Sequence, residues 1–277
     1  MRLASVGNKP DIPYQTDLKK IKLHKDRNQE NYKFKINKKK MTSVRELAKM
    51  IDHSILQPTH TDDDLKKQCE IAVKYEVASV CVKPYAVKHA VGLLKGSDVE
   101  TGCVIGFPHG NSSTRVKVFE AEQACKEGAT EIDMVINIGK ALGGDWEYVE
   151  NEIKAVTDTC HQNGAIVKVI FETDYVTKKE DKILLCEICT RAGADFVKTS
   201  TGYGFVKQQN GDFNYRGATV EDIELMRRHS GPKVRVKCAG GVRTLDDLLK
   251  MKAAGATRSG ATATEAILAD ALTRFGK

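Results

Sequence analysis

The segment "RAGADFVKTSTGYGF", Arg191–Phe205, contains the unit from which the fold of this chain is inferred. It opens with the end of a helical pattern, which stops at Gly193, because glycine readily adopts the conformation that ends a helix. The apolar pair Phe196 and Val197 follows, as is typical of a buried strand. That strand ends on Lys198, and small hydroxyl and glycine residues come next. The segment therefore predicts a helix, a glycine stop, a strand and a polar loop.

The same unit recurs along most of the chain. Helices are expected to begin where a threonine is followed three positions later by an acid, at Thr61, Thr177, Thr219 and Thr244. Glycines are expected to end them at Gly128, Gly164, Gly193, Gly231 and Gly255. Eight strand-like runs result: Ile51–Leu56, Ala78–Lys83, Thr101–Phe107, Thr130–Asn137, Ala165–Glu172, Ala194–Lys198, Lys233–Lys237 and Ala256–Gly260.

Each strand-like run is followed by a helical pattern, so strands and helices alternate over about 230 residues. This alternation predicts an α/β fold in which eight parallel strands close into a β/α barrel. A doubly wound open sheet is the rival architecture, but the first strand lacks the G-x-G-x-x-G turn of dinucleotide-binding sheets. We therefore expect one barrel domain, residues 41–277, preceded by a separate extension, residues 1–40.

The net charge of +7 is concentrated in that extension. Residues 1–40 hold 12 Lys and Arg against 4 Asp and Glu, whereas residues 41–277 hold 32 against 33. Because the extension has few apolar residues and no periodicity, we interpret it as a disordered segment, with a polyanion-binding arm as the alternative. Its lysines and acids argue against a mitochondrial transit peptide. The barrel itself gives no reason to expect a nucleic-acid partner.

The eight cysteines have irregular spacings, and no secretory signal precedes them, so we expect reduced thiols and a cytoplasmic location. No stretch is apolar enough to span a bilayer, and no membrane partner is expected. Cys186 and Cys189 have the C-x-x-C spacing but lie in an amphipathic helical pattern without a second pair. His109 and His161 are isolated in the sequence. We therefore expect neither a metal nor another cofactor.

A second segment, "VRVKCAGGVR", Val234–Arg243, also ends its strand on a lysine, Lys237. In a β/α barrel the chemistry gathers where strands end, so Lys198 and Lys237 are expected to lie together inside the barrel. Two enclosed ammonium groups repel, and one of them should lose its proton readily. A neutral amine attacks carbonyl carbons and forms Schiff bases. Asp133 and Lys168 are expected to face the same interior, although any single lysine could instead extend to solvent.

Five motifs of this chain resemble those of the deoxyribose-phosphate aldolases, which are class I, Schiff-base aldolases with a β/α barrel. They are "IDHSILQPT", "EIDMVIN", "FVKTSTGYG", "VKCAGGVRT" and "GATRSGAT", in the family's order between about Ser43 and the C-terminus. The resemblance implies that Lys198 forms the Schiff base and that Asp133 and Lys237 make a proton relay. Two residues, Cys238 and Ser259, depart from the family's pattern.

The family reversibly cleaves 2-deoxy-D-ribose 5-phosphate to D-glyceraldehyde 3-phosphate and acetaldehyde, a step of deoxyribonucleotide catabolism. A small phosphorylated sugar or aldehyde is accordingly the expected partner. Other interpretations stay open at this point: a transaldolase-like or keto-acid aldolase, or a phosphate- or nucleic-acid-binding protein that uses the basic extension. The state of assembly, including a homodimer or homotetramer, also stays open.

The phosphate end of the substrate is expected at the loops after the last two strands, where such barrels usually bind phosphate. Glycines there let backbone N–H groups approach a ligand, although they could equally be ordinary turn residues. The candidate binding residues are Thr201, Gly202, Gly204, Gly240, Gly241, Gly260 and Thr262. Asp52, Cys81 and Lys168 are candidates for supporting roles.

Overall fold

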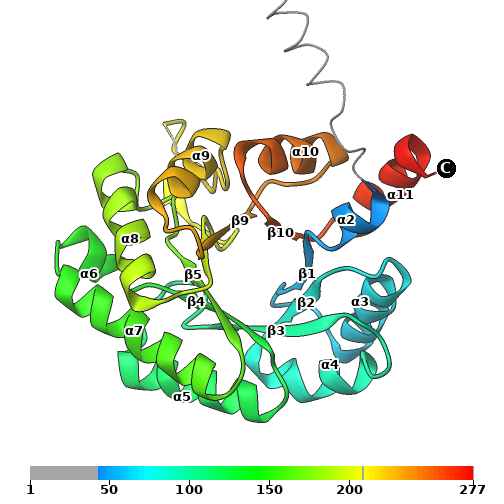
Figure 1. The fold of residues 1–277 in the computed structure, drawn as a ribbon, viewed down its shortest axis with the longest axis horizontal. Coiled ribbons are helices and arrows are strands. Elements are labelled where there is room, and N and C mark those ends of the chain that lie inside the picture. Colours follow the sequence, from blue (N-terminus) through cyan, green and yellow to red (C-terminus); the bar gives the residue numbers. More distant parts are fainter. Residues whose placement is uncertain (1–42, 208, 277) are drawn as a thin grey trace, which may run out of the picture. The chain divides into compact units, whose positions relative to one another are not determined.

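The computed structural model describes residues 43–207 and 209–276, and in them eight parallel strands close into a barrel (Figure 1). The order around the barrel is β1-β10-β9-β6-β5-β4-β3-β2. The barrel strands are β1 (Ile51–Ile55), β2 (Ser79–Val82), β3 (Glu100–Ile105), β4 (Glu131–Val135), β5 (Ile166–Ile170), β6 (Phe196–Lys198), β9 (Arg235–Ala239) and β10 (Arg258–Ala261). The predicted closed barrel is confirmed, because β1 pairs with β10 and leaves no open edge.

Helices surround the barrel on the outside (Figure 1). They are α2 (Val44–Ala48), α3 (Asp62–Lys74), α4 (Val87–Leu93), α5 (Thr114–Lys126), α6 (Ile138–Leu142), α7 (Trp146–Gln162), α8 (Lys179–Ala192), α9 (Val220–His229), α10 (Leu245–Ala254) and α11 (Thr264–Phe275), with a 3-10 turn, η1 (Pro84–Ala86). Their apolar faces and the outward side chains of the strands form the main hydrophobic core. Among the described residues, no helix is long and apolar enough to cross a membrane.

Three of the four predicted helix starts are confirmed. Thr61 and Thr244 form reciprocal capping boxes with the acids three positions later, and the Thr219 hydroxyl accepts the Asp222 N–H. The prediction at Thr177 is wrong, because α8 begins at Lys179, follows an extended Lys178 and has no side-chain cap. A threonine two residues before the helix cannot reach the N–H groups that a capping side chain must satisfy.

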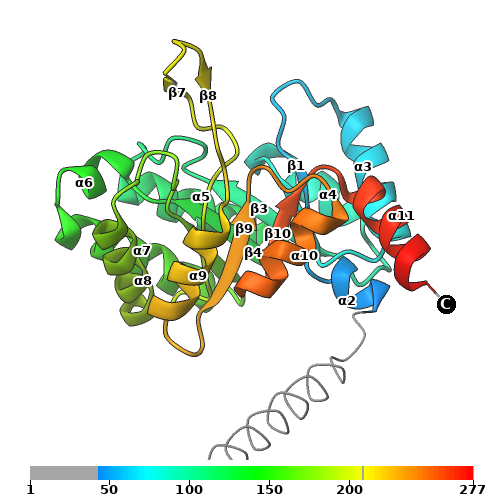
Figure 2. The same cartoon turned by 90° about the horizontal axis from the view of Figure 1, so that it is seen from above.

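The sequence pattern did not predict the antiparallel hairpin of β7 (Val206–Lys207) and β8 (Phe213–Asn214), which lies between β6 and α9. It projects beyond the strand ends of the barrel (Figure 2). Two exposed rings, Phe205 and Phe213, stack on it with centroids 4.3 Å apart. The Asn210-Gly211 pair, a common hairpin turn, was the local signal for this element.

The two departures from the family's pattern lie together, outside the barrel interior. Ser259 and Cys238 are partners in the β10–β9 register, and both are fully buried. Since side chains alternate along a strand, they face the helix layer while Lys237 and Arg258 face inward.

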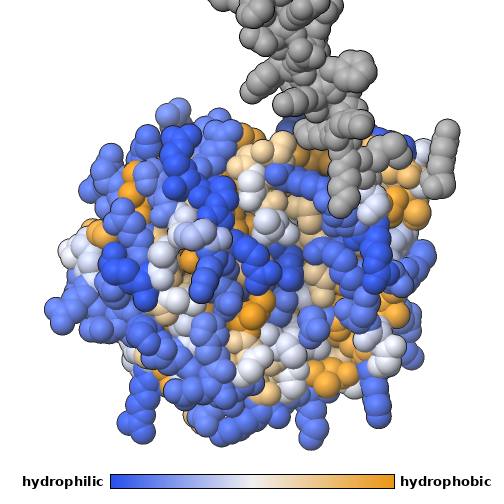
Figure 3. Space-filling model, in the orientation of Figure 1, coloured by the Kyte–Doolittle hydropathy of each residue, from blue (hydrophilic) through white to orange (hydrophobic). Residues whose placement is uncertain are grey.

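The view of the barrel end in Figure 3 shows a largely hydrophilic rim with less polar residues between. The prediction for residues 1–40 lies outside the described residues.

Candidate active site

Lys198, the last residue of β6, and Lys237, in the middle of β9, lie side by side as register partners. The prediction that this second strand ends on Lys237 is wrong, because β9 continues to Ala239. Their side chains point into the barrel and are only 3% and 1% exposed. One carboxylate oxygen, Asp133 Oδ2, lies 2.7 Å from the Nζ atom of each lysine. The two ammonium positions are therefore joined through a single acid on β4, which is the arrangement that the resemblance implies for a nucleophile and a proton relay.

A wider polar network lies beneath these three residues. Lys168 Nζ is 2.5 Å from Glu131, 2.9 Å from Asp133 and 3.2 Å from Asp52. The Asp52 oxygen that Lys168 contacts, Oδ2, also lies 2.5 Å from Lys237 Nζ. Asp52 and Lys168 thus connect the lysine pair to the other buried charges of the barrel, and their supporting role stays a prediction.

Two members of this network, Glu131 and Arg258, were not predicted from the sequence. The Arg258 guanidinium bonds to Asp52 and lies 3.0 Å from Glu131 Oε2. Both residues lie two positions before a candidate site residue, Glu131 before Asp133 and Arg258 before Gly260. The two-residue period of a strand was therefore the signal that could have found them.

The charges of this network balance only when Lys198 is neutral. The described interior brings three carboxylates together with three other cations, and all six are at most 11% exposed: Asp52, Glu131 and Asp133 with Lys168, Lys237 and Arg258. A protonated Lys198 would add a fourth, unmatched positive charge in a buried site, and burying an unpaired charge is costly. Lys198 is therefore the lysine that most easily gives up its proton.

The pKa shifts agree with this balance. Burial lowers the pKa of Lys198; the Asp133 carboxylate opposes that effect, but the charge of Lys237 adds to it, and the net shift is downward. Burial also acts to lower the pKa of Lys237, but the carboxylates of Asp133 and Asp52 outweigh it and raise that pKa. Burial would raise the pKa of Asp133, yet the surrounding lysines hold it well below its usual range. Lys237 thus stays cationic and Asp133 anionic.

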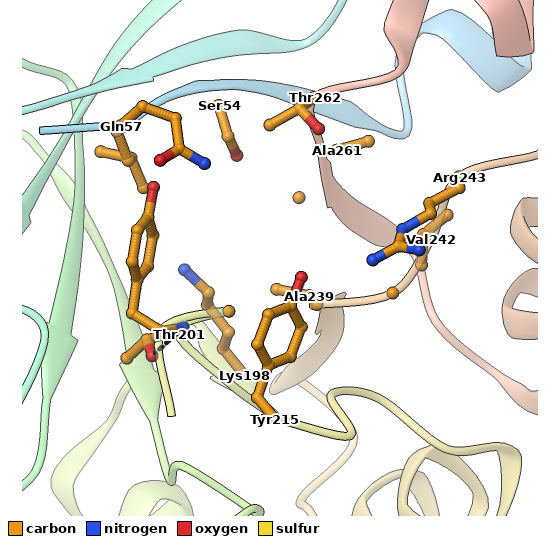
Figure 4. Close-up of a pocket in the computed structure, with 16 residues that line it drawn as sticks. Ser54, Gln57, Lys198, Thr201, Tyr215, Ala239, Val242, Arg243, Ala261 and Thr262 are labelled. Atoms are coloured by element: carbon orange, nitrogen blue, oxygen red, sulfur yellow. Dashed lines mark hydrogen bonds between the residues drawn. The ribbon is translucent and has the colours of Figure 1, made fainter. Parts of the chain in front are cut away.

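Above the lysine pair lies a cavity of about 110 Å³, into which the Lys198 amine points (Figure 4). Of the residues predicted to bind phosphate, six line it: Thr201, Gly202, Gly240, Gly241, Gly260 and Thr262. Gly204 does not line it and packs between Asp174 and Tyr215. Cys81 lies outside the lining in a small apolar cluster with Leu56 and Val104, and burial raises the pKa of its thiol to about 11.

The cavity has further polar lining residues that the sequence analysis missed, namely Ser54, Gln57, Tyr203, Tyr215 and Arg243. Figure 4 shows the Arg243 guanidinium and the Tyr215 ring at the edge of the cavity; Arg243 lies in the loop after β9, whereas Tyr215 directly follows β8. Most of these residues lie in loops, where no period relates them to a strand face. Only the three-dimensional path of the loops brings them to the site.

The lining opposite Gln57 is suited to an anionic group. Gly202, Gly240 and Gly241 all have φ between 82° and 86°, a left-handed conformation that favours glycine and exposes backbone N–H groups. Thr262 lies just before α11, whose first N–H groups lack partners within the helix. Arg243 adds a positive charge to the same side. The cavity therefore offers an amine at one point and an anion-binding wall at another.

Comparison with known proteins places the chain in a family. The model of the DeoC/LacD family aldolases matches residues 46–269. The deoxyribose-phosphate aldolase of Rhodopirellula baltica is 48% identical over 231 residues, 83% of this chain and 91% of the relative. That of Thermococcus kodakarensis is 50% identical over 218 residues, 78% and 92% of the two chains.

A solved structure agrees with these sequence relatives. The tetrameric deoxyribose-phosphate aldolase of Aeropyrum pernix has a TM-score of 0.73 against this chain, with 30% identity, and the match covers 82% of this chain and 92% of that one. The shared barrel, the extent of the match and the identity of the relatives leave one conclusion about ancestry. This chain belongs to the DeoC/LacD family of aldolases.

Proposed function

We propose that this protein is a class I aldolase that reversibly cleaves 2-deoxy-D-ribose 5-phosphate to D-glyceraldehyde 3-phosphate and acetaldehyde. The observation that carries the proposal is the enclosed Lys198, whose amine points into the cavity while its charge is disfavoured by the balanced network below. The names of the relatives, all deoxyribose-phosphate aldolases, support the choice of substrate.

The proposed reaction begins when the neutral Lys198 amine adds to the C1 carbonyl of the open-chain sugar. Loss of water gives an iminium, which withdraws electrons from the C2–C3 bond. A base removes the proton of the C3 hydroxyl, the C2–C3 bond breaks, and C3 leaves as the aldehyde carbon of D-glyceraldehyde 3-phosphate. The electron pair remains on the enzyme as an enamine. Protonation of C2 and hydrolysis of the iminium then release acetaldehyde and restore the amine.

Asp133 and Lys237 are the proposed proton carriers for these steps. The Asp133 carboxylate contacts both lysines at 2.7 Å, so it can pass a proton between the Lys198 side and the Lys237 side of the site. Neither residue lines the cavity, and a water molecule would complete the path to the substrate. The glycine-rich loops, Thr262 and Arg243 are proposed to hold the phosphate at the other side.

The test is reductive trapping of the iminium. Sodium borohydride added together with acetaldehyde should leave a stable ethyl adduct on Lys198, located by peptide mass spectrometry, and should inactivate the enzyme. Chelators should leave the rate of acetaldehyde release unchanged, because the iminium supplies the electron withdrawal. An adduct on Lys168 or Lys237 instead would contradict the assigned nucleophile. A preference for keto-acid donors would favour another Schiff-base aldolase.

The small phosphorylated sugar is the only partner that the proposed reaction requires. One structural relative, from Aeropyrum pernix, is described as tetrameric. We propose that this chain also assembles as a homo-oligomer, which light scattering of the purified protein would test.

A further inference from the structure

We propose that the turn Glu172–Tyr175, between β5 and α8, determines how tightly the enzyme holds the phosphate end of its substrate, with Asp174 as the main positioning residue. The inference rests on the proposed function and extends it to residues that do not touch the substrate. The turn contacts the two segments that flank the β7–β8 hairpin: the first leg, residues 201–205 before β7, and the second leg, residues 215–218 after β8. The two legs carry Tyr203 and Tyr215 to the cavity wall.

Glu172 orders the beginning of the first leg. Its side chain is buried, and Oε2 accepts hydrogen bonds from the Thr201 hydroxyl and, at 3.2 Å, from the Thr201 N–H. The Thr201 oxygen in turn accepts the Tyr203 N–H at 2.9 Å. Glu172 also has φ of 56°, a strained conformation for a residue other than glycine. Such strain persists only where surrounding contacts impose it, and it gathers at functional sites.

Asp174 orders the second leg. Its Oδ1 atom accepts the Arg216 N–H at 2.6 Å, and its Oδ2 atom accepts the Gly217 N–H at 3.1 Å. Gly217 lies directly against the glycine loop after β9, Gly240–Gly241, because a Cβ atom on Gly217 would be 2.5 Å from Gly240 O. The next residue, Ala218, donates its N–H to the same Gly240 oxygen at 3.1 Å. One carboxylate therefore holds the leg that packs on the glycine loop after β9.

The first leg returns to the same turn. A Cβ atom at Gly204 would lie 3.2 Å from Asp174 Cβ and 3.4 Å from Tyr215 Cβ, so the two legs and the turn meet at this glycine. Phe205 donates its N–H to the Tyr175 hydroxyl at 2.9 Å. Gly204, predicted to bind phosphate, instead supports the wall from behind.

This arrangement separates the phosphate wall from the reacting groups. Lys198, Asp133 and Lys237 are fixed by barrel strands and by the buried network, whereas Tyr215 and the Gly240 loop depend on Asp174. Releasing the second leg should therefore weaken phosphate binding while the chemical step proceeds. The expected signature is a higher KM for the phosphorylated sugar with nearly unchanged kcat.

The experiment compares Asp174→Ala with Asp174→Asn and with Asp212→Asn. Asp212 is an exposed acid on the same hairpin that bonds to Asn210 rather than to the turn. For Asp174→Ala we expect KM for 2-deoxy-D-ribose 5-phosphate to rise about tenfold, the size expected for one charge-assisted hydrogen bond. Asp174→Asn keeps the volume and should show a smaller rise of the same kind. Asp212→Asn should behave as wild type.

Two further readouts separate positioning from general loss of structure. Cleavage of 2-deoxy-D-ribose, which lacks the phosphate, should keep its kcat/KM in the Asp174 variants, and calorimetry should show weaker binding of inorganic phosphate. Equal losses for both sugars, or an unchanged KM for the phosphorylated one, would overturn the inference. If the wild-type enzyme released no acetaldehyde from the phosphorylated sugar, the proposed function would fail. The affinity for inorganic phosphate would still test the role of the turn. A weaker affinity in Asp174→Asn than in the wild type supports that role, and an equal affinity contradicts it.

Discussion

At the level of single residues, the number of acidic partners distinguishes the three interior lysines. Lys168 contacts three carboxylates, Lys237 contacts two and Lys198 contacts one. Burial disfavours the charge of all three, so the lysine with the fewest carboxylates is the one whose pKa falls. The proposed nucleophile is thus selected by its neighbours rather than by its own chemistry.

The Lys237→Leu change should lower kcat by about 100-fold or more, because proton transfer loses a partner. It also removes a positive charge that lowers the pKa of Lys198. The pKa of Lys198 should therefore rise, and since only the neutral amine reacts, the acidic limb of the pH–rate profile should move to higher pH. The measurement is kcat/KM against pH for both proteins.

Lys237→Arg serves as the matched variant for that prediction. It restores the positive charge but holds its proton too firmly to transfer it. The acidic limb should then return toward its wild-type position, while kcat stays low. Near-normal turnover in Lys237→Leu would mean that Lys237 is only a structural lysine of the barrel interior.

At the level of elements, the helix starts offer a paired test of local sequence signals. Thr244 forms a capping box with Asp247 at the start of α10, whereas Thr177, in the same sequence pattern, caps no helix. Thr244→Ala should lower the free energy of unfolding by about 1 kcal/mol, and Thr177→Ala should change it by less than about 0.5 kcal/mol. Urea denaturation of both variants measures the difference. Equal losses would show that the Thr177 side chain stabilises the protein in another way.

At the level of the whole molecule, the interior charge balance should set the pH range of activity. Glu131→Gln removes a negative charge, so the pKa of Lys198 should fall and the acidic limb should move to lower pH. Arg258→Met removes a positive charge, so Lys198 should keep its proton more firmly and the limb should move to higher pH. Both residues lie below the cavity and do not line it. Shifts of the same sign in both variants would contradict the balance.

The charge division along the chain gives a second prediction at this scale. Residues 1–40 carry the excess positive charge, and the family match begins only at residue 46. Deleting residues 1–40 should leave kcat and the melting temperature nearly unchanged, while weakening any retention on heparin. Loss of activity in a truncated protein that is still folded would place the extension in the site.

Much of the fold could be predicted from the sequence because its signals are local. Glycine stops, threonine caps and apolar runs each act within a few residues, and together they located all eight barrel strands. The hairpin after β6 was missed because its strands are two residues long, too short for a period to be recognised. The cap at Thr177 failed because the same local pattern is compatible with more than one helix start.

The candidate site, like the fold, could be predicted from the sequence only in part. The sequence by itself determined which strands carry a lysine and which residues alternate with it, since the two-residue period is a property of the strand. Only the closed barrel decided that Asp133 lies between Lys198 and Lys237, 65 and 104 positions away in sequence. It also brought Asp52 and Arg258, from opposite ends of the chain, into one network. A pKa depends on the charges nearby in space, and chain closure determines which charges those are.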